Sequence, residues 1–302
     1  MIYWLIGLVA PLLWGTTYAV TQHWMGGMDP LWVASLRILI PGLLLMPFVP
    51  LSVWQKAWKS MVILGTFNIG IFTMLLFQAI SRLPGGVAAT LVSTVPLQIL
   101  LIRWVTGKAP RLLQMLAAIG GSAGVALLVW RAAEPLDPIG IVLALLAGFF
   151  MSVGMLMIPR FAKGVPPLPM AAGQFLICGV VLVALVWASG HPLPHFDLPA
   201  VLAMVWIAPV GMGVGYLCWF KALQHIPSDQ LSFLGLLNPL VAVFCGIALM
   251  GEQLSLVQGL GMALVLACVV LAQLKPSLFR RRMESVLSTA TETGIKAAKS
   301  PL

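Results

Sequence analysis

Hydrophobic residues run along this chain in ten long stretches, separated by short segments that hold most of the charged residues. Each stretch is long enough for an α-helix to cross the roughly 30 Å hydrocarbon core of a bilayer. The pattern predicts an all-α polytopic membrane protein with ten transmembrane helices. The predicted helices cover residues 3–22, 31–49, 60–82, 85–106, 111–130, 138–159, 169–189, 199–221, 228–250 and 255–274.

The linkers between these helices alternate between two sides of the membrane, and their positive charges are very unequal. Of the 17 Lys and Arg residues, 14 fall on the side that holds both termini, and two, Arg82 and Arg131, fall on the other. Loops that stay in the cytoplasm keep an excess of Lys and Arg. We therefore predict a multi-pass protein of the inner (plasma) membrane with both termini in the cytoplasm.

Composition agrees with this assignment and excludes several other classes of protein. The 302 residues are 61% hydrophobic and only 8% charged, whereas soluble domains carry about 25% charged residues. The net charge of +9 belongs to the loops and the tail, so it indicates no nucleic-acid partner. The four cysteines lie within apolar stretches with no Cys-x-x-Cys spacing, and we predict neither a metal site nor a cofactor.

The second half of the chain repeats features of the first. Gly70 and Gly213 are 143 residues apart, and four further residues keep this interval: Phe77, Ala79, Pro84 and Pro96 match Phe220, Ala222, Pro227 and Pro239. We predict a five-helix repeat over 1–133, a second over 134–275, and a basic cytoplasmic tail over 276–302. Because five is odd, the second repeat is inverted, as in many secondary transporters whose substrate site lies where the halves meet.

Short motifs in both halves resemble a known family. They are Trp14-Gly15, Ala34-Ser35-Leu36-Arg37, the Phe-x-Ala…Pro…Pro pattern of both halves, and Gly251-Glu252. The chain is similar to the EamA family of the drug/metabolite transporter superfamily, and within it to the YddG-type exporters of amino acids and related metabolites. The resemblance implies an exporter with a central cavity lined mainly by predicted helices one, three, four, six, eight and nine. The halves differ where Ala147 matches Trp14 and Lys108 matches Glu252.

Ionisable side chains are almost absent from the depth of the predicted membrane. All eight acids and all four histidines lie in loops, at helix ends or in the tail. Proton-driven pumps generally carry such a group within the membrane. We therefore predict a carrier of neutral or zwitterionic solutes that moves its substrate down a gradient, with no built-in carboxylate for proton coupling.

Arg37 is the one charged residue inside a predicted helix, about 10 Å deep at 1.5 Å per residue. A charge at helix centre costs about 2.5–3.5 kcal/mol on insertion scales, so this side chain needs partners. Two interpretations remain open. Arg37 either binds carbonyl groups at helix ends and stabilises the fold, or faces the cavity and attracts a substrate carboxylate.

Neutral polar and aromatic side chains at membrane depth are the candidate lining of the cavity. Ser and Thr also bond back to their own helix, Asn also joins helices, and aromatic residues also face lipid, so a structural role is the alternative for each. The candidate cavity residues are Trp14, Thr17, Tyr18, Asn68, Phe72, Thr90, Ser93, Thr94, Gln98, Phe149, Ser152, Tyr216, Trp219, Ser232 and Asn238.

Four residues are candidates for hinges. Pro84 and Pro227 lie in tight links, which predicts that the third and fourth helices, and the eighth and ninth, act as gates. Gly211 and Gly213 follow Pro209 in the eighth helix, where they predict either a bend or close packing.

Together these features predict a secondary transporter, not an enzyme, that exports small neutral or zwitterionic metabolites, chiefly amino acids including aromatic ones. Its partners would be the substrate and the lipid bilayer, and it would be a monomer or a weak dimer. An intramembrane enzyme lacks its catalytic set here, and a receptor or channel does not explain inverted halves. Carriers of cationic drugs, or of phosphorylated sugars and nucleotide sugars, are alternatives within the superfamily, although a dianion would need several cations in the cavity.

Overall fold

A computed structural model describes residues 2–107, 109, 112–130, 136–223, 225, 226, 234, 235 and 237–273. All regular elements within these ranges are helices. They are α1 (Ile2–Met25), α2 (Pro30–Leu45), η1 (Met46–Phe48), α3 (Leu51–Gly65), η2 (Thr66–Ile71), α4 (Phe72–Ile80), α5 (Gly85–Val92), α6 (Val95–Val105), α7 (Leu112–Trp130), α8 (Pro138–Phe161), α9 (Pro167–Ala188), α10 (Leu198–Val205), η3 (Trp206–Val214), α11 (Gly215–Leu223), α13 (Leu237–Met250) and α14 (Leu256–Gln273).

The predicted all-helical membrane protein is confirmed. In the described part of the chain, seven helical spans are long and apolar enough to cross a membrane, and four of these combine two or three shorter elements. Three further apolar helices are shorter: Leu112–Val125, Leu237–Met250 and Leu256–Leu271. The count of ten crossings remains a prediction.

One helix boundary was predicted wrongly. The third helix begins at Leu51 and not at residue 60, so Lys56 and Lys59 lie on a helix rather than in a loop. Ala57 is buried while both lysines are exposed, so this first part of α3 is amphipathic. A hydropathy average detects only segments that are apolar throughout, so it misses the polar start of α3. A helix can have one polar face when its other face is buried.

Acidic residues begin three of the helices. Asp29, Asp137 and Asp197 each accept, through the side chain, the N–H of a residue in the first turn, and proline occupies one of the first two positions. Such caps satisfy backbone donors that have no partner within the helix. These carboxylates therefore stand at helix ends, as the sequence predicts.

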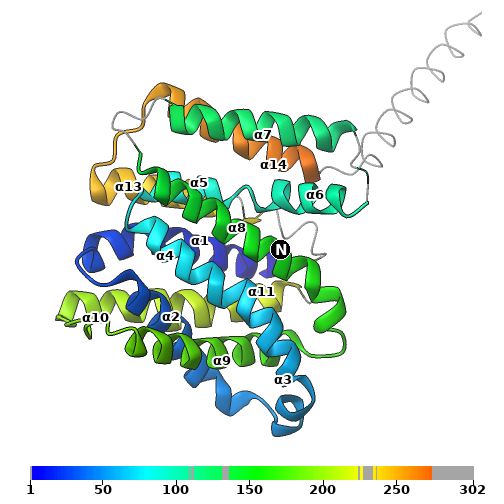
Figure 1. The fold of residues 1–302 in the computed structure, drawn as a ribbon, viewed down its shortest axis with the longest axis vertical. Coiled ribbons are helices and arrows are strands. Elements are labelled where there is room, and N and C mark those ends of the chain that lie inside the picture. Colours follow the sequence, from blue (N-terminus) through cyan, green and yellow to red (C-terminus); the bar gives the residue numbers. More distant parts are fainter. Residues whose placement is uncertain are drawn as a thin grey trace, which may run out of the picture.

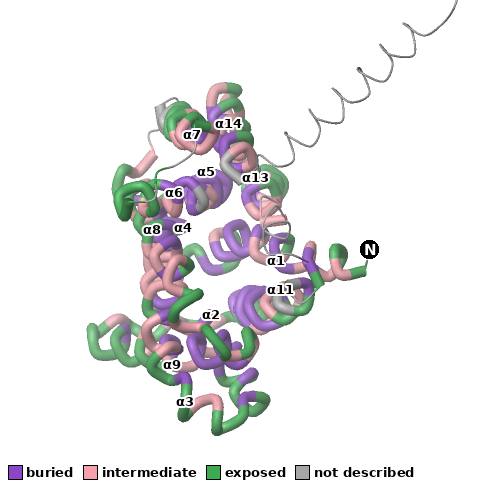
Figure 2. The backbone as a smooth tube through the Cα atoms, turned by 90° about the vertical axis from the view of Figure 1, so that its right-hand side faces the viewer, coloured by how far each residue is buried: buried purple, intermediate pink, exposed green. Residues whose placement is uncertain are grey.

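The helices run across the molecule and are stacked one beside another along its long axis (Figure 1). Figure 1 shows α7 and α14 paired at the top, α3 and α9 at the bottom, and α1, α4, α8 and α11 between them. Figure 2 views the bundle after a quarter turn and shows buried residues concentrated on the inward faces of α1, α2 and α5. The functional candidates from α1, α2, α4 and α11 therefore meet in the middle of the bundle.

Helices α2 and α9 cross with their backbones in contact. A Cβ atom on Gly42 would lie 2.5 Å from the backbone nitrogen of Leu176, and one on Gly179 would lie 2.5 Å from the Cα of Leu39. The contact is reciprocal, because each leucine precedes its own helix's glycine by three residues. Small residues of this kind allow helix backbones to approach closely in membranes.

Candidate functional site

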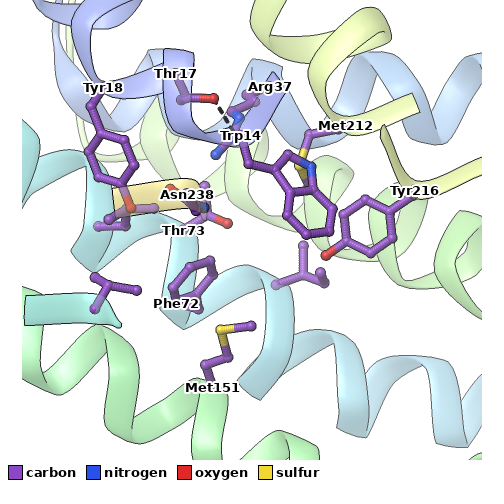
Figure 3. A pocket seen from close by; sticks show the side chains of 13 residues that line it. Trp14, Thr17, Tyr18, Arg37, Phe72, Thr73, Met151, Met212, Tyr216 and Asn238 are labelled. Atoms are coloured by element: carbon purple, nitrogen blue, oxygen red, sulfur yellow. Dashed lines mark hydrogen bonds between the residues drawn. The ribbon is translucent and has the colours of Figure 1, made fainter. Parts of the chain in front are cut away.

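A cavity opens in the middle of the bundle, between helices that are far apart in sequence. Its volume is about 140 Å³, below the roughly 300–1,000 Å³ of drug-sized ligand sites, so the cavity as it stands admits only a small solute. Its wall is mainly apolar with a few polar groups (Figure 3). The lining residues are Trp14, Thr17, Tyr18, Arg37, Ile69, Phe72, Thr73, Leu76, Val92, Met151, Met212, Tyr216 and Asn238.

Two π-helical segments shape this wall. η2 separates α3 from α4, and η3 separates α10 from α11. A π-helical turn contains an extra residue and often marks a functional site. In η3 the cause lies in the sequence, because Pro209 has no N–H to donate and its ring crowds the preceding turn. The irregular segment coincides with the predicted bend around Gly211 and Gly213.

Carbonyl groups of η3 bind two side chains of the cavity. The indole N–H of Trp14 donates to the carbonyl of Gly211 at 2.9 Å. The Nε–H of Arg37 donates to the carbonyl of Ile207 at 3.3 Å. The π-helical segment thus holds both residues by its backbone.

The guanidinium of Arg37 is buried, with 5% of the residue exposed, and its bonds are long. Besides Ile207, its Nη2 donates to the hydroxyl of Thr17 at 3.4 Å, and its centre lies 5.2 Å from the ring centroid of Phe77. No carboxylate pairs with Arg37 among the residues that the structure describes. A buried cation without a counter-ion is poorly compensated, and it would favour an anionic group beside it.

Aromatic rings form the wall opposite Phe72. The ring centroid of Trp14 lies 5.2 Å from that of Tyr216 and 5.6 Å from that of Trp219. Phe175 packs edge-on against Tyr216 at 5.0 Å. Pairs of this geometry add packing energy beyond the area they bury, so this wall is a rigid aromatic surface.

Asn238 brings an unsatisfied acceptor to the cavity. Its Oδ1 atom is buried and has no hydrogen-bond partner. Buried polar atoms without partners are uncommon and suggest a missing ligand or water. The residue comes from α13, whose backbone packs on α1 at Gly15.

Six of the predicted cavity residues line the cavity: Trp14, Thr17, Tyr18, Phe72, Tyr216 and Asn238. Arg37 lines it as well, and its contacts combine the two interpretations, since it binds a backbone carbonyl and also faces the cavity. That carbonyl belongs to the π-helical η3 and not to a helix end.

Three hydroxyl residues predicted for the cavity lie elsewhere. Thr90, Ser93 and Thr94 donate to the carbonyls of Gly86, Thr90 and Leu91 at 2.8, 2.7 and 2.6 Å. These bonds satisfy the hydroxyls within their own helices, which was the structural alternative. Val92, an apolar residue of the same segment, lines the cavity instead.

Asn68, Gln98 and Ser152 also lie outside the cavity lining, at interfaces with α8. The amides of Asn68 and Gln98 sit against Gly154 and Gly148, where a Cβ atom would collide with them. Gln98 donates to the carbonyl of Leu145 at 3.3 Å, and Ser152 of α8 donates to the carbonyl of Val95 in α6 at 3.3 Å. These side chains join helices rather than face the cavity.

The remaining predicted residues have other positions. Phe149 is 42% exposed and lines an outer groove between α6 and α8, so its assignment to the central cavity was wrong. Trp219 stands behind Trp14. Pro84 precedes α5 directly. Pro227 and Ser232 lie outside the described residues.

Six lining residues were not predicted: Ile69, Thr73, Leu76, Val92, Met151 and Met212. Five are apolar, and apolar residues at this depth carry no signal that separates cavity from lipid or core. Thr73 could have been found, because it is a neutral polar residue at membrane depth, the property that selected the other candidates.

Ion pairs join loops and helix starts at one end of the bundle. Arg82 binds Asp137 at 3.0 Å, and His191 contacts Asp29 at 2.5 Å. The hydrogen bond from Arg82, assisted by the N–H of Ile139, holds the pKa of the Asp137 carboxyl below its usual value. These contacts tie the α4–α5 turn to α8, and the α1–α2 link to the α9–α10 link.

The apolar helical bundle and its internal cavity, mainly apolar with a few polar groups, are typical of a polytopic membrane protein of the transporter type. A model of the EamA-like transporter family matches residues 1–130 and 138–273, and the chain belongs to this family. The family is part of the drug/metabolite transporter superfamily, as predicted. The YddG-type specificity remains a prediction.

Several curated proteins are similar over most of their length. "Protein PecM" of Dickeya dadantii is 34% identical over 90% of this chain and 92% of its own. The "uncharacterized inner membrane transporter YedA" of Escherichia coli K12 is 28% identical, with 89% of each chain covered. A solved crystal structure shares the fold at a TM-score of 0.66 and 23% identity, over 93% of this chain and 98% of that one.

Proposed function

We propose that this protein is a secondary transporter that exports small neutral or zwitterionic metabolites, chiefly amino acids including aromatic ones. The observation that carries the proposal is the cavity itself: a single buried guanidinium without a carboxylate partner, set among aromatic rings and neutral polar groups. Such a cavity suits one carboxylate attached to an apolar body.

Each part of an amino acid has a suitable counterpart in the wall. Arg37 would bind the carboxylate, since a guanidinium presents donors in a fork that matches two oxygens. The unpartnered Oδ1 of Asn238 would accept a hydrogen bond from the ammonium group. Trp14, Phe72 and Tyr216 would contact an apolar or aromatic side chain.

Phosphorylated substrates fit less well. Arg37 is the one charged residue among the described residues that line the cavity. A nucleotide sugar or sugar phosphate carries two or more negative charges, and their desolvation would need further cations. A cationic drug would be repelled by the same guanidinium.

Two inverted five-helix repeats would supply the transport mechanism. Three observations support them: the family model matches two successive segments, the contact of Gly42 and Gly179 with Leu176 and Leu39 is reciprocal, and η2 begins 143 residues before Pro209 of η3. Alternating access would follow from movement of one half against the other. The α3–α6 helices and their counterparts in the second half would act as the gates, with Pro84 and Pro227 as pivots.

We further propose that both termini are cytoplasmic and that the protein resides in the inner membrane as a monomer or weak dimer surrounded by lipid. The unequal distribution of Lys and Arg supports this orientation. The end that carries the α4–α5 turn then faces outward.

Counterflow in proteoliposomes tests the function. Purified protein is reconstituted with a high internal concentration of one amino acid, and uptake of the labelled compound is followed for a panel of amino acids, sugar phosphates and organic cations. We expect transient accumulation for neutral amino acids and none for sugar phosphates. Accumulation only of sugar phosphates or cations would contradict the proposal, as would uptake that collapses when the pH gradient is removed.

A further inference from the structure

The turn between α4 and α5 is held from α1 by a single amide. The Nε2 of Gln22 donates to the carbonyls of Ile80 and Leu83, at 2.8 and 2.6 Å. Both carbonyls lie at the C-terminal end of α4, where helices leave acceptors without partners. Gln22 therefore ties the end of α4 to α1.

The start of α5 is held by a carboxylate from the second half of the chain. Pro84 provides no side-chain cap, and Oε1 of Glu252 accepts the N–H of Gly85 at 2.8 Å, across 167 residues of sequence. Gly251, at a φ of 66°, ends α13 and turns the chain, and the N–H of Glu252 bonds back to the carbonyl of Gly246 at 3.1 Å. A negative charge at a helix N-terminus is also favoured by the helix dipole.

The same region closes the bundle by close backbone packing. A Cβ atom on Gly85 would lie 3.0 Å from the Cβ of Tyr18, and one on Gly86 would lie 2.8 Å from a methyl group of Val243. The first turn of α5 thus fills the space between α1 and α13. Val92 of the cavity wall follows Gly85 by seven residues, about 10 Å along the helix, so this packing lies between the cavity and the end of the bundle.

One atom of this contact set is left unsatisfied. The Oε1 of Gln22 is buried without a partner, although its Nε2 makes two bonds. If the turn moved away, water would hydrate that oxygen and offset part of the lost bonds. The hydrogen bonds of Gln22 therefore stabilise the closed arrangement, and hydration of its Oε1 would lower the cost of opening.

The opposite end of the repeat lacks the same groups. In the repeat register, Gln22 corresponds to Met155 at an offset of 133, and Glu252 corresponds to Lys108 at an offset of 144. A methionine cannot bond two carbonyls, and a lysine disfavours contact with a helix N-terminus. In the sequence, therefore, the residues that hold the α4–α5 turn are not repeated at the corresponding positions of the other half.

We propose that Gln22 and Glu252 are positioning residues that latch the α4–α5 turn, keep the cavity closed at this end, and must be released in the step that opens it to the outside. This inference rests on the proposed function. It places the latch at the outward-facing gate. Opening on that side then requires the hydrogen bonds of Gln22 and Glu252 to break.

Cysteine accessibility tests the latch without any substrate. In a background whose four native cysteines are replaced, a cysteine at Val92 in the cavity wall is labelled with a membrane-impermeant maleimide from each side of the membrane. A cysteine at Arg82, on the exposed turn, marks the turn side. We expect Glu252→Ala and Gln22→Leu each to raise the labelling rate of position 92 from the turn side about tenfold, the effect of losing a charged or double hydrogen bond.

Asp197→Asn is the matched control, because the carboxylate of Asp197 caps its own helix, where it accepts the N–H of Ala200 at 2.9 Å. Unchanged labelling in both latch variants would overturn the proposal. If the variants fail to fold, amide hydrogen exchange of the parent protein tests the latch instead. We expect the amides of residues 85–88 to exchange at least a hundredfold slower than in an unstructured peptide. Exchange at the unstructured rate would also overturn the proposal. Failure of counterflow with faster labelling would reject the proposed substrates and leave the latch standing.

Discussion

The indole N–H of Trp14 donates to the carbonyl of Gly211, 197 residues away in sequence, at 2.9 Å. Gly211 belongs to the π-helical η3. A side chain of the first half of the chain therefore donates to the backbone of the second half, and it does so in the wall of the cavity.

Trp14→Phe should destabilise the protein, since it keeps an aromatic ring and leaves the Gly211 carbonyl without this donor. The expected cost is about 1–3 kcal/mol, the usual penalty for a buried group that loses its partner. Thermal unfolding in detergent measures it. Trp219→Phe is the control, because that indole makes only ring contacts here; equal losses in the two variants would show that ring size and not the hydrogen bond matters.

Arg37→Lys tests the role of the guanidinium. A lysine keeps the charge but cannot present two parallel donors to a carboxylate. We expect folded protein at the parental level and a KM raised roughly ten- to hundredfold for transported amino acids, in line with the loss of about 1.5–3 kcal/mol. The matched control is Arg103→Lys, at an exposed arginine of α6 outside the cavity, which should leave the KM at the parental value. Loss of folded protein would instead assign Arg37 to the fold.

Gly42→Ala and Gly179→Ala test the crossing of α2 and α9. Each added methyl group meets backbone atoms at 2.5 Å, so the helices must separate, at a cost of about 1–3 kcal/mol. Gly259→Ala is the control, because nothing lies within 4 Å of its Cβ position and alanine favours a helix. A thermal unfolding series should lower the midpoint for the first two variants only.

The Arg82–Asp137 pair predicts a pH dependence at acid pH. Because the pKa of Asp137 is lowered in the folded protein, the stabilisation is complete above the ordinary Asp value of about 3.9 and disappears as the pH falls through the lowered value. Asp137→Asn keeps a good helix cap, so it should melt below the parent at pH 7, and the difference should shrink as the pH falls below about 4. Arg82→Gln should lose the same pH dependence. A difference that grows toward acid pH would contradict this assignment.

The sequence predicted well how deep a residue lies in the membrane, and poorly which way its side chain faces. Arg37 is buried and faces the cavity, and the Pro209–Gly211 region is irregular, as expected. Thr90 and Ser152 are at the expected depth, yet Thr90 bonds within its own helix and Ser152 bonds to Gly148 and to Val95 of α6. Neutral polarity alone does not separate such contacts from the wall of a cavity. Asn68 has a different reason, because it lies in the π-helical η2, and such a segment inserts an extra residue that rotates everything after it by about 100° around the helix axis.

The amino-acid sequence by itself determined that this is a helical membrane protein, because transfer into a bilayer depends on the summed hydropathy of consecutive residues, and its short motifs indicated the EamA family. It also determined that Arg37 would be the charge at depth. The tertiary structure alone decided which polar side chains meet in the cavity and that Glu252 reaches Gly85. Those outcomes depend on how helices from the two halves pack against one another, and no local pattern encodes the distance between segments 167 residues apart.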